Sequence, residues 1–421
     1  MNSARPRLLF LSQCLPYPTD EGVKIRTYNV LKHLSRDFDV RALCFYRKAG
    51  YQSEEKVRDA TATLAKFADI TTYAIPQEHS VRRALWDHGR SLLSRRAYTF
   101  WAYSSKTFRR DLHEALRDFR PDVIHIDSLD LSCYLRELPA AIPVICTHHN
   151  VESALLFRRS ESETFLRRWY LRLQSRLTEK EERFWIPRLS MNVAVSDFDR
   201  EAFQQICGDA HFITVTNGVD TTEIRELPDV EGGLVFVGGS TWYPNRDALA
   251  YFANEILPLV RQYLPEIRVT WVGQCTEEDR VSMKDQYGIE LTGYVDSIES
   301  YVADASCYVV PLRVGGGTRL KILYAWSMSR AVVSTSIGCE GLRAIDGGNT
   351  LIRDTPQGFA DAVVQVVGSP EFRRRLATEG RRMAEARYDW NVITQEMLAA
   401  YHEVLRSTRA AIRDAATHSV R

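Results

Sequence analysis

Residues 314–323 read Val-Gly-Gly-Gly-Thr-Arg-Leu-Lys-Ile-Leu, and they separate the apolar segment Cys307–Val310 from a stretch with helical spacing. A short apolar run that ends in a glycine loop indicates a buried strand, and the spacing after the loop indicates a helix. The same succession of strand, turn and helix recurs along the chain. Alternating strands and helices predict parallel sheets with helices on both faces, which is the α/β class.

Two series of strand-like segments lie in the two halves of the chain. The first half contains Leu8–Ser12, Val40–Phe45, Val123–Ile126, Val144–Thr147 and Met191–Val195. The second half contains Leu234–Val237, Val269–Val272, Ile289–Leu291, Cys307–Val310, Val332–Ser334 and Thr350–Ile352. We therefore predict two doubly wound, Rossmann-like domains with a ligand in the cleft between them, beyond the carboxyl ends of the strands.

The polar and acidic segment Arg225–Gly233 has the composition of a linker between these domains. We place the N-terminal domain at residues 1–220 and the C-terminal domain at residues 221–389. An amphipathic helical pattern then runs from Trp390 to the end of the chain.

Composition restricts the class of protein further. The chain has 421 residues, of which 45% are apolar and 26% charged, and its net charge of +1 argues against a nucleic-acid partner. The eight cysteines form no C-x-x-C pair, which indicates buried thiols in a reducing compartment. The apolar run Leu8–Leu11 is too short for a signal peptide, and no segment is apolar enough to cross a membrane. We expect a cytoplasmic protein, in solution or at the inner face of the membrane.

The glycine loop has the features of an anion site. Glycines let backbone N–H groups approach a ligand closely, and a helix that starts near Thr318 presents its positive end. Arg319 and Lys321 add two cationic side chains. Together these groups suit a diphosphate, although the spacing is not that of a Walker A loop. The alternative is an irregular loop with two solvated bases.

Two further loops follow predicted strands of the first half. Pro16–Arg26 contains Gly22, which permits close approach of a ligand, and Arg26, which lies one turn into the following helix. His148 and His149 follow the strand Val144–Thr147, so one of them is expected to point beyond the sheet and to hydrogen-bond a sugar hydroxyl or a phosphate oxygen. The alternatives are an ordinary turn with a surface arginine and a solvated or core histidine pair.

We predict no metal site. Adjacent histidines do not share one face, and the two D-x-D strings, residues 37–39 and 197–199, are interpreted as structural. Ser196 fits the N-cap position of the helix that contains the second string.

The segment Val81–Arg110 holds eight basic residues and one acidic residue, interleaved with aromatic residues. Such a segment lies on an anionic membrane, grips a lipid-linked acceptor, or is a solvated helical face. The sequence alone does not decide among these interpretations.

Several of these segments resemble the family-four glycosyltransferases, the large retaining group of GT-B fold, and in particular the branch of exopolysaccharide and PEP-CTERM-associated sugar transferases. The resemblance spans nearly the whole chain. It rests on the opening loop to Arg26, His149–Glu152, Asn217–Asp220, Gly238–Asn245, Gly315–Lys321 and Val333–Leu342.

The resemblance implies a donor of the nucleotide diphosphate sugar type, carrying UDP or GDP, and no cofactor or metal. It implies that His149 lies near the transferred sugar and that Arg319 and Lys321 hold the diphosphate. It also implies that the final helix, 390–421, packs back on the N-terminal domain. The residues expected around the donor are Gly22, Arg26, Ser240, Val295, Gly316, Gly317, Thr318, Tyr324 and Glu340.

This chain departs from the family pattern at three places. The family carries two glutamates eight positions apart around the glycine loop, and here these positions are Gly316 and Tyr324. A tyrosine hydroxyl cannot replace the acceptor pair of a carboxylate on a ribose. The usual arginine and lysine after the first C-domain strand are replaced within Gly239–Trp242. These departures leave the donor open.

The expected activity is transfer of a sugar to a glycan, a lipid-linked or a small-molecule acceptor, with retained configuration. Charge that grows on the departing diphosphate would be stabilised by Arg319, Lys321 and the helix N-terminus. A catalytically silent partner of an active transferase is the alternative, motivated by Gly316 and Tyr324. An epimerase would need a carboxylate pair, and a phosphorylase would need a cofactor lysine; the sequence offers neither.

Overall fold

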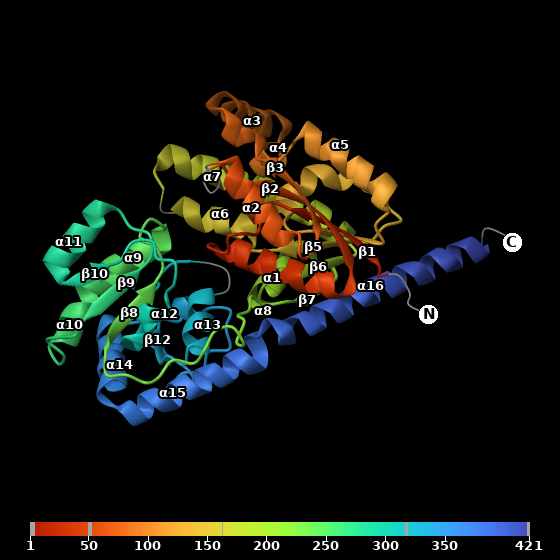
Figure 1. Ribbon diagram of the computed structural model, residues 1–421. Helices are drawn as coiled ribbons and strands as arrows, with labels where there is room; N and C mark the ends of the chain where they lie inside the picture. The colour runs from red at the N-terminus through yellow and green to blue at the C-terminus, as the bar shows by residue number, and fades with distance from the viewer. Residues whose placement is uncertain (1–4, 49–52, 162, 316–318, 419–421) are drawn as a thin grey trace. The chain divides into compact units, whose positions relative to one another are not determined.

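The computed structural model describes residues 5–48, 53–161, 163–315 and 319–418. The chain divides into two compact units: unit 1, Met1–Thr216 with Thr394–Arg421, and unit 2, Asn217–Ile393. Each unit is an α/β structure built on one parallel sheet (Figure 1).

In the described part of unit 1, seven parallel strands form a sheet in the order β3-β2-β1-β4-β5-β6-β7. The strands are β1 (Arg7–Ser12), β2 (Asp39–Tyr46), β3 (Asp69–Ala74), β4 (Val123–Ile126), β5 (Val144–His148), β6 (Met191–Ala194) and β7 (Phe212–Thr214). Leu8 to Leu11 of β1 are fully buried, because helices cover both faces of such a sheet.

The helices of unit 1 lie between these strands along the chain. They are α1 (Gly22–Asp37), α2 (Glu54–Leu64), α3 (Val81–Ser94), α4 (Tyr98–Ala102), α5 (Lys106–Glu114), α6 (Glu152–Glu161), α7 (Phe165–Trp185) and α8 (Asp197–Cys207). Ser196 caps α8 by accepting a hydrogen bond from the Asp199 N–H, which confirms the predicted N-cap.

In the described part of unit 2, six parallel strands form a sheet in the order β10-β9-β8-β11-β12-β13. The strands are β8 (Gly233–Val237), β9 (Val269–Val272), β10 (Ile289–Leu291), β11 (Ala305–Val310), β12 (Val332–Ser334) and β13 (Leu351–Ile352). The helices are α9 (Tyr243–Tyr251), α10 (Leu257–Arg261), α11 (Glu277–Tyr287), α12 (Glu299–Ala303), α13 (Leu320–Ser327), α14 (Pro356–Gly368) and α15 (Pro370–Met383).

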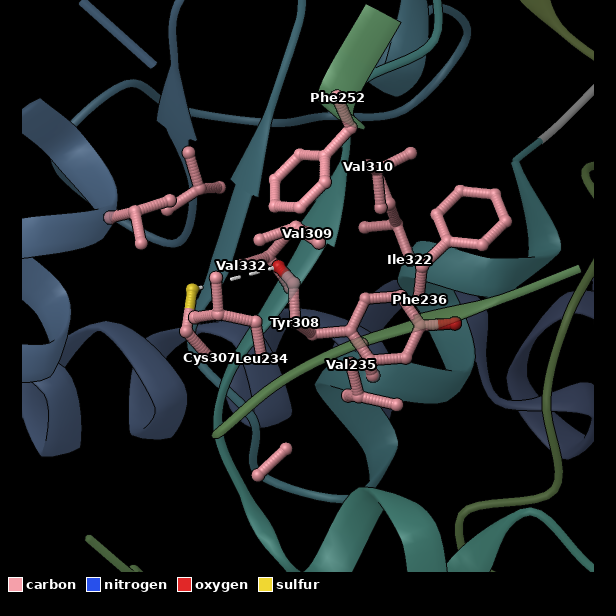
Figure 2. Close-up of a cluster of buried hydrophobic side chains, with 14 of the residues drawn as sticks. Leu234, Val235, Phe236, Phe252, Cys307, Tyr308, Val309, Val310, Ile322 and Val332 are labelled. Carbon is pink, nitrogen blue, oxygen red and sulfur yellow. Dashed lines mark hydrogen bonds between the residues drawn. The ribbon is translucent and has the colours of Figure 1, made fainter. Parts of the chain in front are cut away.

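The core of unit 2 lies around its two central strands. Figure 2 shows side chains of β8 and β11 packed with Phe252 and with Ile322 of α13. Phe236 stacks on Trp271 at a centroid distance of 3.8 Å. This packing fixes the position of α13, the helix that carries Lys321.

The last helix, α16 (Trp390–His418), contributes to unit 1 from Thr394 onward. Tyr401 is fully buried there, and its hydroxyl lies 2.5 Å from His125 Nδ1. His402 Nε2 lies 3.0 Å from Asp37 Oδ2 at the end of α1. These contacts attach the helix to the sheet of unit 1.

The segment Arg225–Gly233 does not separate the two units. The boundary falls after Thr216, and the segment packs on unit 2. Arg330 donates hydrogen bonds to the carbonyl oxygens of Leu227 and Pro228, and Arg373 pairs with Asp229 at 2.6 Å. Its polar composition reflects these buried arginine contacts rather than a free linker.

Candidate functional site

In unit 2 the neighbours of β8 determine where a ligand can bind. β9 pairs with one edge of β8 and β11 with the other, so chain connections leave this point in opposite directions. Such a switch point opens a crevice beyond the carboxyl ends of the two strands. Gly238 follows β8 and Pro311 follows β11, so the loops after both strands begin at this crevice.

Lys321 lies in the first turn of α13 beside that switch point. Its Nζ donates to Asn245 Oδ1 at 2.8 Å and lies 4.1 Å from the ring centroid of Phe236. Burial, and secondarily the charge of Arg319, lower the pKa of Lys321 to about 7. Lys321 makes no ion pair with any described residue. An anionic ligand would therefore supply the negative partner of its ammonium group.

Arg319 precedes α13 and is also buried. Its Nε donates to the Ile337 carbonyl oxygen at 3.0 Å, and its guanidinium lies 3.5 Å from the Glu340 carboxylate. The structure thus brings together Arg319 and Glu340, which are far apart in the sequence. Two basic side chains, Arg319 buried and Lys321 half-buried, thus lie together at the start of α13.

Two glycines allow the cationic side chains to lie so close to the loops. Gly238 has a φ of 152°, and a Cβ there would lie 3.0 Å from Lys321 Nζ and 2.7 Å from Asn245 Nδ2. Gly315 has a φ of 147°, and a Cβ there would lie 2.9 Å from Arg319. Side chains at either position would displace the cations.

The other residues of unit 2 that are expected around the donor have contacts within that unit. Ser240 is buried and donates to Asp279 Oδ2 at 3.0 Å. Val295 and Tyr324 are half-buried and pack against the hydrophobic core, and burial raises the pKa of the Tyr324 hydroxyl. Gly316, Gly317 and Thr318 lie outside the described residues.

In unit 1 the corresponding switch point lies between β1 and β4. Asp127 follows β4 directly and is fully buried. Its Oδ2 accepts hydrogen bonds from Thr27 at 2.6 Å and from Ser12 at 3.2 Å. Burial alone would raise the pKa of this carboxyl, but the adjacent His149 and His125 outweigh burial and lower it. Asp127 is therefore a buried carboxylate that faces two imidazoles.

His149 follows β5 and turns toward Asp127. Its Nε2 lies 2.7 Å from the Asp127 carbonyl oxygen and 3.4 Å from Oδ1. A carbonyl oxygen only accepts, so Nε2 carries a proton, and Nδ1 accepts a hydrogen bond only in the neutral form of the ring. This is the arrangement of a histidine that is held in one orientation and can receive a hydrogen bond from a ligand.

His148 has a different environment. Its Nε2 lies 2.9 Å from Asn192 Oδ1, and its ring packs 4.8 Å from that of Phe203. Burial lowers the pKa of His148 to about 4, so the ring is neutral. Of the two adjacent histidines, His148 belongs to the core and His149 to the polar cluster.

Gly22 and Arg26 both lie on α1. Gly22 is its first residue, as expected for a loop that opens a helix. Arg26 is only 1% exposed and donates to the Thr216 carbonyl oxygen at 3.0 Å. Burial lowers the pKa of Arg26 to about 10, although the charge of Asp127 favours the cation. The guanidinium is therefore enclosed within unit 1 rather than presented at its surface.

The sequence analysis did not identify two residues of these clusters, Asp127 and Asn245. Asp127 occupies the position directly after a buried strand, as His149 nearly does, and that position was a usable signal. Asn245 had no such signal, because its contact with Lys321 depends on the packing of α9 against α13. Among the described residues, no group of three or more His, Cys, Asp or Glu side chains is arranged to hold a metal ion.

Two family models match successive parts of the chain. Residues 21–223 match the model described as Glycosyltransferase Family 4, and residues 231–369 match the model described as Glycosyl transferases group 1. Together they cover most of the chain. The fold is the GT-B fold. The part of the chain at residues 21–223 is similar to glycosyltransferase family 4, and the part at residues 231–369 is similar to the group 1 glycosyl transferases.

The chain is also similar to curated proteins over part of its length. It is 27% identical over 164 residues to an uncharacterized 44.6 kDa protein in the cps region of Klebsiella pneumoniae, covering 37% of this chain and 42% of that protein. It is 22% identical over 229 residues to the phosphatidyl-myo-inositol mannosyltransferase of Mycolicibacterium smegmatis, covering 50% of this chain and 57% of that protein. The chain thus spans about half the length of the curated relatives it matches.

A solved structure supports the fold over a greater length. The crystal structure of Anabaena HepE in complex with UDP matches with a TM-score of 0.65 and 13% sequence identity. The match covers 94% of this chain and 100% of that chain. At this identity the likeness establishes the GT-B fold alone.

Proposed function

We propose that this protein is a retaining, metal-independent glycosyltransferase that takes a sugar from a nucleotide diphosphate donor. The observation that carries the proposal is that buried Arg319 and half-buried Lys321 come together at the start of α13, where Lys321 makes no ion pair with a described residue. A buried excess of positive charge is costly unless an anion joins it. A donor diphosphate supplies that anion.

The proposed reaction breaks the bond between the sugar C1 and the diphosphate oxygen and forms a bond from C1 to an acceptor oxygen on the same face. The proton of the acceptor hydroxyl passes to the departing phosphate. Negative charge grows on the diphosphate in the transition state, so Lys321 and Arg319 stabilise the transition state more than the ground state. His149 accepts a hydrogen bond from the transferred sugar through Nδ1.

Relatives narrow the donor and acceptor classes that we propose. The HepE structures are complexes with UDP and with UDP-glucose, which supports a nucleotide-sugar donor of the UDP or GDP type. The cps-region and phosphatidyl-myo-inositol relatives favour a glycan or lipid-linked acceptor over a small molecule, and a role in polysaccharide synthesis. A lipid-linked acceptor places the protein at the inner face of a membrane.

The experiment measures thermal stabilisation and slow nucleotide release with a panel of UDP and GDP sugars. We expect one donor to stabilise the wild-type protein and to be hydrolysed, and Arg319→Ala/Lys321→Ala to lose both effects. The matched control is Arg280→Ala/Lys284→Ala on α11, which removes two exposed cations and should behave as wild type. Equal stabilisation of the wild type and the Arg319/Lys321 variant would contradict the proposed diphosphate site.

A catalytically silent GT-B partner is the second candidate. It is favoured by Tyr324, which packs against the core of unit 2 where the family carries a glutamate. A silent partner would bind neither donors nor free nucleoside diphosphates and would release no nucleotide. The same panel therefore separates the two candidates.

A further inference from the structure

Helix α3 of unit 1 exposes its apolar side chains instead of burying them. Its buried positions are Asp87 and Ser91, and the opposite face carries Leu85, Trp86 and Leu93. Trp86 is 63% exposed and Leu93 is 86% exposed. A surface helix normally turns its apolar face toward the core, so this inverted arrangement indicates a partner outside the unit.

The first turns of α7 have the same inverted arrangement. Phe165, Leu166 and Trp169 are exposed, and Phe165 reaches 83%. The buried side chains of α7 begin at Gln174, one turn further on. The apolar residues at the start of this helix therefore contribute nothing to the core of unit 1.

Helices α3 and α7 are in contact within unit 1. His88 Nδ1 of α3 contacts the Tyr170 hydroxyl of α7, and Gln174 donates to Ser91 Oγ at 2.9 Å. His88 contacts Tyr170, and Ser91, further along α3, contacts Gln174, further along α7. The two helices therefore run in the same direction, and their first turns are at the same end. We call Leu85, Trp86, Leu93, Phe165, Leu166 and Trp169 the α3/α7 patch.

Arginines surround this patch with little acid to balance them. Residues 81–96 and 165–172 contain eight arginines and one acidic residue, Asp87, which is buried against Arg83 at 2.7 Å. Arg82 and Arg95 are exposed and form no ion pair with a described residue. Before α7, Glu161 is exposed, and the half-buried Glu163 is shared between Arg159 and Arg167.

We infer that the α3/α7 patch is a docking surface for an anionic phospholipid membrane. Tryptophan, phenylalanine and leucine side chains enter the boundary between headgroups and acyl chains, and the flanking arginines meet the lipid phosphates. Charge complementarity favours a membrane over a second copy of this chain. In a dimer the arginines of the two copies would face one another, whereas on an anionic bilayer they face lipid phosphates. This inference goes beyond the proposed transfer reaction and does not depend on it.

The test is co-sedimentation of the full chain with vesicles of phosphatidylcholine containing about one third phosphatidylglycerol. We expect binding that weakens as salt is raised, because salt screens the arginines. We expect Trp86→Ser/Trp169→Ser to weaken vesicle binding by about tenfold or more, since two buried aromatic rings are lost. Arg82→Glu/Arg95→Glu should remove the preference for these vesicles over pure phosphatidylcholine.

The matched control is Tyr263→Ser/Val281→Ser, which removes two exposed apolar side chains of unit 2 and should bind vesicles as wild type does. Nucleotide release without an acceptor should be unchanged in the patch variants, which separates this inference from the proposed activity. Vesicle binding that is absent at low salt, or that both patch variants retain in full, would overturn the inference. A dimer in sedimentation that the Trp86/Trp169 variant dissociates would overturn it in favour of a second copy.

Discussion

His149 Nε2 lies 2.7 Å from the backbone carbonyl oxygen of Asp127, and this single contact fixes which ring nitrogen carries the proton. The side-chain carboxylate of Asp127, 3.4 Å away, favours the same orientation. Two strands that are neighbours in the sheet, β4 and β5, place the two residues together at their carboxyl ends. The histidine is oriented before any ligand arrives, so little ordering entropy is lost on binding.

The first prediction concerns His149. We expect His149→Ala to lower the turnover of the donor by about tenfold to a hundredfold, because a preoriented hydrogen bond to the reacting sugar is lost. Turnover is measured as nucleotide release, and circular dichroism checks that the fold is retained. His113→Ala is the matched control, since His113 is exposed and pairs with Glu137. Equal loss in both variants would rule out a role specific to His149.

A second prediction follows from the environment of Lys321. Its pKa is lowered to about 7 by burial and by Arg319, so the side chain becomes neutral as the pH rises above 7. An anionic diphosphate favours the ammonium form and raises its pKa on binding. Between pH 7 and pH 9 the affinity for a nucleoside diphosphate should therefore fall, by about tenfold per pH unit at most, with uptake of a proton.

Calorimetry in buffers of different ionisation enthalpy measures that proton uptake. This pH range lies above the second phosphate pKa of about 6, so the ligand itself does not titrate. Lys321→Met should bind more weakly and lose the pH dependence. An affinity that falls equally with pH in both proteins would assign the titration to another group.

The sequence predicted both sheets well, but it did not indicate every residue of the two polar clusters. Segments such as Val123–Ile126 are short apolar runs buried on both faces, and they match β4 without error. The strand β3, Asp69–Ala74, was missed because its edge position leaves half-polar side chains that carry no apolar run. Asn245 was missed for a related reason: nothing local to α9 indicates that its amide meets Lys321.

Arg26 shows what local reasoning leaves out. One turn into a helix after a glycine-containing loop, an arginine is predicted to face a ligand, and this remains a prediction. The structure adds a contact with the Thr216 carbonyl oxygen, 190 residues away in sequence. Long-range packing of this kind leaves no periodic signal in the sequence.

A third prediction tests the attachment of α16 to unit 1. Tyr401→Phe removes the hydroxyl that lies 2.5 Å from His125 Nδ1 and leaves that buried nitrogen without its partner. We expect a cost of about 1–3 kcal/mol in the free energy of unfolding. Calorimetry should show a transition lowered by about 2–4 °C for each kcal/mol in a unit of this size. Tyr263→Phe, at an exposed tyrosine, should leave the transition in place.

The last prediction concerns close packing in unit 2. Gly380 of α15 lies against Trp326 of α13, and a Cβ at Gly380 would lie 2.5 Å from Trp326 Cδ1. Trp326 is fully buried, and its indole N–H donates to the Asn349 carbonyl oxygen at 3.0 Å, so the ring cannot move without breaking that bond. Gly380→Ala should therefore destabilise the unit by about 1–3 kcal/mol, because an added methyl group overpacks the core.

Gly89→Ala is the matched helical control, because a Cβ there meets nothing within 4 Å. That substitution should be neutral or stabilise by about 0.5–1 kcal/mol through helix propensity. Chemical denaturation of both variants gives the comparison. Equal stability of Gly380→Ala and Gly89→Ala would contradict the tight packing of α15 against α13. In that case α13 would not hold Lys321 as rigidly as the proposed donor site requires.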